Sequence, residues 1–179
     1  MFKNTFLIGL TLILTLSGCS NEDATSKSSS KLEVVTSSPT NFTIENFFSL
    51  GFKKYRIYDV AELQGATDAV FGFWGEGSYE RKEYEIRIYG SHEDAVSLGE
   101  PLAKEATGND AVIKSSKSSW KEGLKDRRTI GGPGSGGGGR SGSFPKYGNY
   151  AIYGNVVMLC EGAEEIALEI CWRLINELN

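Results

Sequence analysis

The sequence predicts a small α+β domain in which an antiparallel sheet of about five strands carries two main helices on one face. Three observations support this two-layer sandwich. Residues 83–89 alternate between apolar and charged side chains, as a half-buried strand does. Residues 163–178 carry a broad apolar stripe at helical spacing. The order strand, strand, helix occurs twice along the chain, and two such units place their helices on one sheet face.

The expected strands are residues 55–60, 69–74, 83–89, 150–153 and 156–160. In the third strand, Tyr84, Ile86 and Ile88 share one face, and charged residues occupy the other. The last two strands flank Gly154 and Asn155, which is typical of a tight hairpin because glycine adopts the positive φ that a two-residue turn requires.

The first main helix begins after Ser91, which forms a capping-box pattern with Asp94, and its apolar face extends to Ala106. Pro101 is expected to kink this helix or to split it in two. A long insert follows, with a short helix expected over residues 119–127. Within the insert, eight of the twelve residues from 131 to 142 are glycine, which predicts a flexible surface loop. A phosphate-loop interpretation fails because the flanking strand, the following helix and the Gly-Lys-Ser/Thr ending are missing.

The chain begins with an export signal. Lys3 precedes an apolar run of about a dozen residues, which suits a secretory signal peptide and is short of the roughly 20 residues of a membrane-spanning helix. The run ends in Leu16-Ser17-Gly18-Cys19, which resembles the lipobox of bacterial lipoproteins. The resemblance implies that residues 1–18 are removed by cleavage between Gly18 and Cys19. It also implies that Cys19 carries the lipid that holds the protein to a membrane on the extracytoplasmic side of the cell envelope.

Composition divides the remaining chain into a tether and one domain. Residues 19–40 are rich in Ser, Thr, Lys and Glu, so we expect a disordered tether after the lipidated cysteine. Residues 41–179 suffice for a single globular domain. Removal of the signal also removes Lys3, so the formal net charge of −4 becomes −5. This mild acidity argues against nucleic-acid binding.

Cys160 and Cys171 are the only cysteines besides Cys19. Cys160 ends an expected strand and Cys171 lies two turns into the helix that packs back on it. Export permits a disulfide between them. Two reduced cysteines that serve as small core residues are the alternative, and the sequence leaves both open.

Six cations against two acids between residues 114 and 128 give the insert a local charge of +4. Lys121, Lys125, Arg127 and Arg128 form the centre of this cluster. As a functional site it would bind an anionic ligand, lipid headgroups or an acidic partner. The commoner alternative is a solvated helix face without a ligand.

The sequence predicts no catalytic residue, no metal and no cofactor. His92 is the sole histidine, too few for a multi-histidine metal centre, and no serine lies in a nucleophile elbow. Aromatic residues cluster in the strands, where they form either the core or an exposed binding platform. Their positions are Phe71, Phe73, Trp74, Tyr79, Tyr84, Tyr89, Tyr150 and Tyr153.

These features together predict a lipid-anchored, non-enzymatic binding or accessory domain at the cell envelope. Its partner, a protein or a small ligand, is not defined by the sequence. The alternative is an envelope hydrolase whose carboxylates converge only in the fold; Asp68, Glu76, Glu80 and Glu83 are examples. A solute-binding protein with two lobes is disfavoured because 139 residues make one lobe.

Overall fold

The computed structural model describes residues 32–130 and 142–179. The chain divides into two units, residues 1–30 and 31–179, and the described residues belong to the second. The predicted signal peptide, Cys19 and the glycine-rich segment, except Gly142, therefore lie outside the described residues. Within the described part, no helix has the length and apolar character needed to span a membrane.

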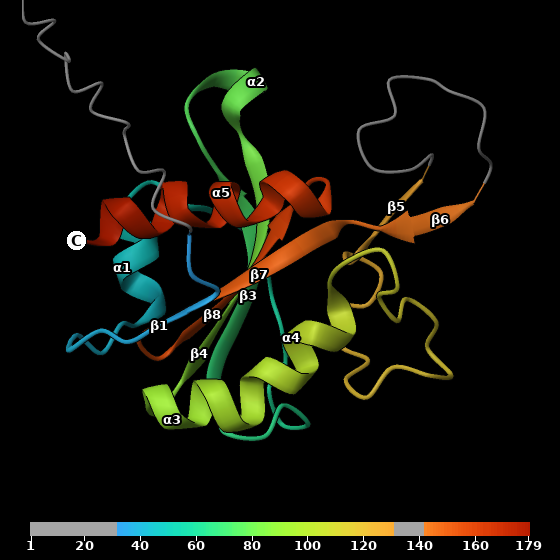
Figure 1. Ribbon diagram of the computed structural model, residues 1–179, viewed down its shortest axis with the longest axis horizontal. Coiled ribbons are helices and arrows are strands. Elements are labelled where there is room, and N and C mark those ends of the chain that lie inside the picture. The colour runs from blue at the N-terminus through green and yellow to red at the C-terminus, as the bar shows by residue number, and fades with distance from the viewer. Residues whose placement is uncertain (1–31, 131–141) are drawn as a thin grey trace, which may run out of the picture. The chain divides into compact units, whose positions relative to one another are not determined.

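Six strands form a mixed sheet in the order β1-β7-β8-β4-β3-β2 (Figure 1). All neighbouring strands are antiparallel except β1 and β7, which are parallel. The six strands are β1 (Val35–Thr36), β2 (Lys53–Ile57), β3 (Ala66–Trp74), β4 (Lys82–Tyr89), β7 (Tyr147–Tyr153) and β8 (Val156–Glu161). A separate two-stranded sheet contains β5 (Arg128–Ile130) and β6 (Ser143–Pro145).

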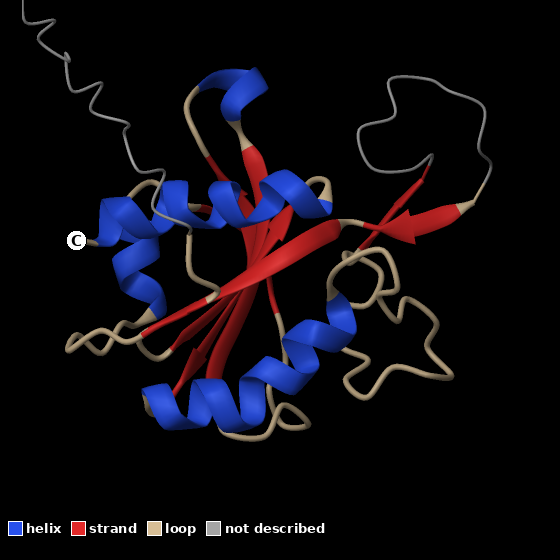
Figure 2. Ribbon diagram, in the orientation of Figure 1, coloured by secondary structure: helices blue, strands red, loops and turns tan. Residues whose placement is uncertain are grey.

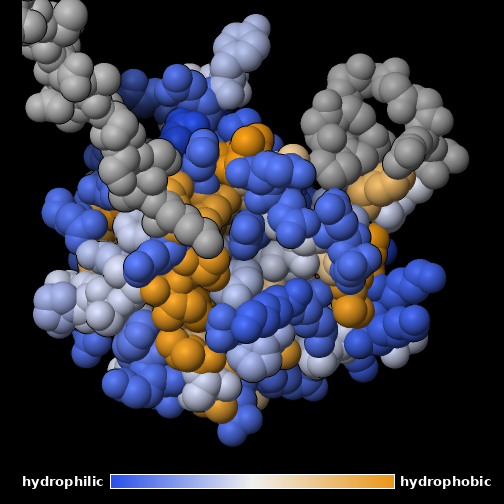
Figure 3. Space-filling view, viewed as in Figure 1, coloured by the Kyte–Doolittle hydropathy of each residue, from blue (hydrophilic) through white to orange (hydrophobic). Residues whose placement is uncertain are grey.

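Strand β1 lies inside the predicted tether, so the boundary at residue 40 is wrong. Val35 pairs with Ile152 of β7, and the indole Nε1 of Trp172 donates to the Glu33 carbonyl at 2.9 Å. Val34 and Val35 are the physical reason, because both pack against the buried cluster beneath them. Figure 3 shows hydrophobic residues gathered in a stripe over β1.

The hairpin predicted at Gly154 and Asn155 is confirmed between β7 and β8. Gly154 has φ +56°, as the turn requires. The buried Asn155 side chain then ties three segments together. Its Oδ1 accepts from the Phe42 amide at 2.7 Å, and its Nδ2 donates to the carbonyls of Phe42 and Tyr89, both at 2.9 Å.

The helices cover both faces of the sheet (Figure 2), whereas the sequence predicted both main helices on one face. The α5 face carries α1 (Ile44–Ser49) and α5 (Glu164–Ile175), and α5 continues into η2 (Asn176–Leu178). The α4 face carries a continuous run of α3 (His92–Asp94), the π-helical η1 (Ala95–Gly99) and α4 (Glu100–Ala106). A single turn, α2 (Gly77–Glu80), joins β3 to β4.

The reason for the two covered faces is that both faces of the central strands are buried. In β8, Val156, Met158 and Cys160 contact the core under α5, while Val157 and Leu159 contact the core under α4. The sequence of an antiparallel strand with two buried faces is a continuous apolar run. Such a run does not indicate which face of the sheet a helix will cover.

Candidate functional site

The insert after α4 crosses the α4 face of the sheet and places Trp120 in its core. Glu105 of α4 fixes its course. The Glu105 carboxylate accepts from the Ser119 amide at 2.8 Å, from the Ser118 hydroxyl at 3.2 Å and from the Ser119 hydroxyl. The short helix predicted over residues 119–127 is wrong, because Ser119, its expected cap, binds Glu105 and the chain turns instead.

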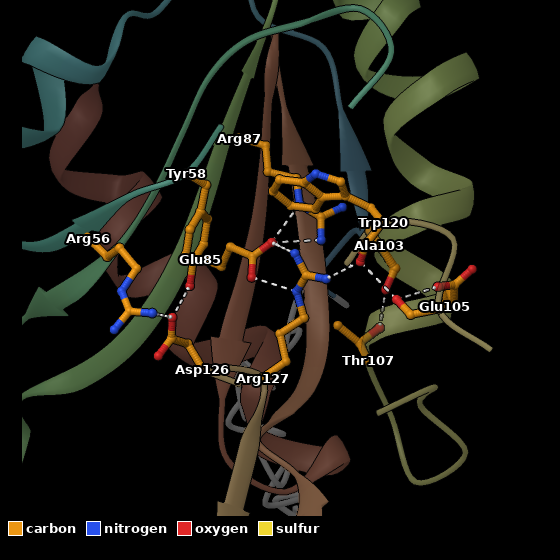
Figure 4. Close-up of polar contacts among 11 residues, drawn as sticks. Arg56, Tyr58, Glu85, Arg87, Ala103, Glu105, Thr107, Trp120, Asp126 and Arg127 are labelled. Carbon is orange, nitrogen blue, oxygen red and sulfur yellow. Dashed lines mark hydrogen bonds and ion pairs between the residues drawn. The ribbon is translucent and has the colours of Figure 1, made fainter. Parts of the chain in front are cut away.

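Beneath this insert lies a buried ionic cluster of Glu85, Arg87, Trp120 and Arg127 (Figure 4). The Glu85 carboxylate accepts from Arg127 Nε at 2.8 Å and Nη2 at 2.9 Å, and from Arg87 Nε at 2.8 Å. The Trp120 ring lies against both guanidinium groups, with its centroid 4.5 Å from Arg127 Cζ and 5.1 Å from Arg87 Cζ. The Glu85 carboxylate thus lies between two guanidinium groups inside the core, although the buried Nη1 and Nη2 of Arg87 have no hydrogen-bond partner among the described residues.

Glu85 is a structural carboxylate rather than an acid–base group. Burial by itself raises the pKa of Glu85, but the neighbouring Arg127 and Arg87 outweigh that effect and hold the pKa below its ordinary value. The side chain has no exposed surface. It therefore stays ionised and out of reach of a substrate.

The position of Arg127 corrects the predicted anion-binding patch. Its side chain is only 3% exposed, because both edges of the guanidinium are occupied by Glu85 and by the Trp120 carbonyl. Arg127 consequently holds the insert to β4 and is unavailable to a ligand. The other three residues of the predicted patch remain near the surface.

Asp126 links this buried cluster to the surface. Its Oδ2 accepts from the Tyr58 hydroxyl at 2.9 Å and pairs with Arg56 Nη1 at 3.2 Å. The turn before it needs a glycine: Gly123 has φ +71°, and a Cβ at that position would lie 2.6 Å from Tyr58 Cζ. The Asp126 amide closes the turn onto the Gly123 carbonyl at 2.9 Å.

The turn forms one wall of a basic cavity of about 320 Å³. Four of its lining residues are cations, and one is an acid. The lining is Arg56, Ser115, Lys121, Glu122, Gly123, Leu124, Lys125 and Arg128. Three of the four predicted patch residues thus come together, and Arg56 of β2 joins them. An anion in this cavity would meet guanidinium and ammonium donors from two separate segments.

A second cavity of about 260 Å³ lies where β4 and β8 approach the start of α5. Lys146 pairs with Glu83 there, and Glu161 Oε2 accepts from the Glu83 amide at 2.7 Å. Ile166 and Ile170 supply an apolar wall. Two carboxylates therefore share this cavity, and one of them is paired with a lysine.

The remaining predicted positions are distributed as follows. His92 Nδ1 lies 2.7 Å from the Gly154 carbonyl. In the structure a disulfide joins the fully buried Cys160 and Cys171, with their Cα atoms 5.6 Å apart, and so ties α5 to β8. Within residues 32–130 and 142–179, no group of three or more His, Cys, Asp or Glu side chains is arranged to hold a metal ion.

Most of the strand aromatics form the core and not a platform. Phe71, Tyr84, Tyr89 and Tyr150 are buried. The most exposed aromatic side chains are those of Tyr79, one of the predicted positions, in α2, and of Tyr55 in the edge strand β2. Sequence reasoning missed Tyr55 and Arg56 as surface features because it assigned them to a strand without knowing that the strand is an edge.

The fold and these sites define an α+β domain with a sheet covered on both faces and a basic cavity at its β2 end. Residues 43–179 match the model of a family of unknown function, DUF6810, and the chain belongs to this family. No curated protein and no solved structure matches the chain.

Proposed function

We propose that the protein is a lipid-anchored binding domain on the extracytoplasmic side of the cell envelope, and that it captures anionic groups in the basic cavity. The single observation that carries the binding role is the convergence of Arg56, Lys121, Lys125 and Arg128 on one cavity. The anchor rests on the lipobox-like Leu16–Cys19 sequence.

The electrostatics favour this role. The chain as a whole carries a net charge of −4, so a concentration of cations around one hollow is a local feature and not a consequence of composition. Asp126 is 13% exposed and its Oδ2 already accepts from Tyr58 while pairing with Arg56. Glu122 is the only carboxylate in the lining. The local potential is therefore positive and attracts anions over roughly a Debye length, about 8 Å at physiological salt.

The lining supports binding better than catalysis. It offers cations, one serine and one glutamate, and the histidine lies elsewhere, beside Gly154. A guanidinium and ammonium set holds phosphate or carboxylate groups without needing to move a proton. We therefore prefer a capture site to a reaction centre.

The binding test uses pyrophosphate as the probe and isothermal titration at low salt. The double variant Lys121→Gln/Lys125→Gln should bind about 5- to 30-fold more weakly, because each lost charge contributes roughly 0.5–1 kcal/mol. The matched control is Lys114→Gln/Lys117→Gln, which removes the same charge from exposed positions at a different hollow. Equal affinity of the two double variants would contradict the cavity as the binding site.

The anchor test is separate. Cells that express the full chain are grown with a fatty-acid analogue, and the wild-type protein should incorporate the label and fractionate with membranes. Cys19→Ser should do neither. A wild-type protein without label would remove the envelope assignment while leaving the cavity prediction untouched.

One observation favours the alternative of an envelope hydrolase, namely that Glu83 and Glu161 share the second cavity. Paired carboxylates are the usual machinery of glycoside hydrolysis. Release of reducing ends from purified cell-wall glycan by the wild-type protein, lost in Glu161→Gln, would support this alternative. No release would leave the binding role as the sole proposal.

A further inference from the structure

Strand β2 is an open edge of the sheet. Among the described residues it pairs with β3 alone, and all five of its residues, Lys53–Ile57, are exposed. An edge strand presents a row of backbone amides and carbonyls that can pair with an added strand. This row borders the basic cavity through Arg56.

A β-bulge shapes the edge. The register with β3 shifts between Lys54 and Arg56, so Tyr55 is the extra residue. Tyr55 packs edge-to-face on Phe71 and Phe73, at centroid distances of 5.6 Å and 6.0 Å, and Arg56 pairs with Phe71 in register. The two side chains therefore lie on the same side of the sheet, where the cavity opens.

Tyr55 and Ile57 stay largely exposed, at 64% and 59%. The aromatic contacts hold Tyr55 in place although most of its surface faces solvent, which lowers the entropy cost of using it as a contact. Exposed apolar side chains on an edge strand offer contact surface to a strand that pairs with it.

The charges of the strand determine which partner can use the edge. Lys53, Lys54 and Arg56 place three cations in five residues with no acid. A second copy of β2 laid against this edge would set cations opposite cations, which is destabilising. A strand that carries acidic side chains would set opposite charges across the pair, each worth about 0.2–1 kcal/mol. Lys125 and Arg128 of the neighbouring cavity extend the same complementarity.

We infer that an extended acidic peptide segment of a partner protein binds by adding a strand to β2, with its carboxylates on Lys53 and Arg56 of the α4 face and its apolar side chains on Ile57 of the α5 face. This inference rests on the proposed binding function and names its partner class. Backbone hydrogen bonds supply the affinity in this mode, and the side chains supply the selectivity.

The probe is a fluorescent heptapeptide of alternating Glu and Val, titrated into the detergent-solubilised mature protein and followed by anisotropy. Two peptides serve as controls. One replaces each Glu with Lys. The other keeps the acidic sequence but carries N-methyl groups on two adjacent central amides, which obstructs pairing along both edges of the peptide while the charge is unchanged. We expect binding of the acidic peptide, binding at least about 10-fold weaker for the methylated one, and none for the Lys peptide.

Protein variants locate the contact. Lys53→Glu/Lys54→Glu should weaken acidic-peptide binding at least about 10-fold, whereas Lys114→Glu/Lys117→Glu, with the same change of net charge, should leave it within about 2-fold. Hydrogen exchange should show new protection in residues 53–57 of the complex. Equal affinity for the methylated and unmethylated peptides, which would indicate a general polyanion site, overturns the inference, and so does absence of binding. Pyrophosphate capture on the same protein tells the two proposals apart, because it persists if only strand addition fails.

Discussion

The buried carboxylate of Glu85 gives the sharpest test of how the core is held together. Glu85→Gln keeps the shape of the side chain but removes the charge that two guanidinium groups share at 2.7–2.9 Å. Arg87 and Arg127 would then stay buried with no carboxylate beside them. Breaking a buried ion pair in this way costs about 3–5 kcal/mol. We expect a loss near 4 kcal/mol, a large share of the roughly 5–15 kcal/mol that stabilises a typical domain.

Urea unfolding followed by far-ultraviolet circular dichroism measures this loss. Glu83→Gln is the matched control, because Glu83 lies two residues earlier on the same strand and pairs with Lys146, yet its side chain is 29% exposed. The control should cost no more than about 1 kcal/mol. A third variant, Glu85→Leu/Arg87→Met/Arg127→Met, removes all three charges and should be more stable than Glu85→Gln. A Glu85→Gln loss no larger than that of the control would refute the reasoning.

The same variant carries a pH signature. The pKa of Glu85 is lowered in the fold from its ordinary value of 4.5, so its contribution is fully present above pH 4.5 and is lost as the pH falls toward the folded value. As the pH falls from 7 to below 4.5, the stability gap between wild type and Glu85→Gln should narrow, because the unfolded chain then binds a proton that the folded Glu85 does not. A gap that stays constant over this range would contradict the assignment of an ionised Glu85.

Two further predictions concern the Cys160–Cys171 disulfide and the turn at Gly123. Reduction of the Cys160–Cys171 disulfide, which closes a loop with a sequence separation of 11, should lower the free energy of unfolding by about 3 kcal/mol, and alkylation without reductant should find neither thiol free. Gly123→Ala should cost at least about 1 kcal/mol more than Gly51→Ala, because both glycines have positive φ but only Gly123 has a ring within 3 Å of the added Cβ. Equal costs in thermal unfolding would show that the Tyr58 contact is unimportant.

The α+β class could be predicted from the sequence because it depends on the local periodicity of apolar residues. Strand β4 was expected at residues 83–89 and occupies Lys82–Tyr89, and the long C-terminal helix was expected from residue 163 and begins at Glu164. The hairpin at Gly154 followed from the conformational freedom of one residue. Each of these features is encoded within a few neighbouring positions.

Only part of the candidate site could be predicted from the sequence. Lys121, Lys125 and Arg128 lie close in sequence, so their charge was visible, but Arg56 reaches the same cavity from β2. In the sequence Arg127 belongs to the same cationic cluster as its neighbours, but in the structure its side chain is buried in the core. No local pattern distinguishes a cation that faces water from one that meets a carboxylate 42 positions away.

By itself the sequence determined the α+β class, the hairpin and the presence of a cationic segment, because these depend on the spacing of residue types along a short stretch of chain. Only the tertiary structure decided that Glu85 and Arg87, on the strand face expected to meet solvent, lie under Trp120 and Arg127. It also decided that β2 is an edge and that helices cover both sheet faces. Burial is a property of what packs above a residue, and that partner comes from a distant part of the chain.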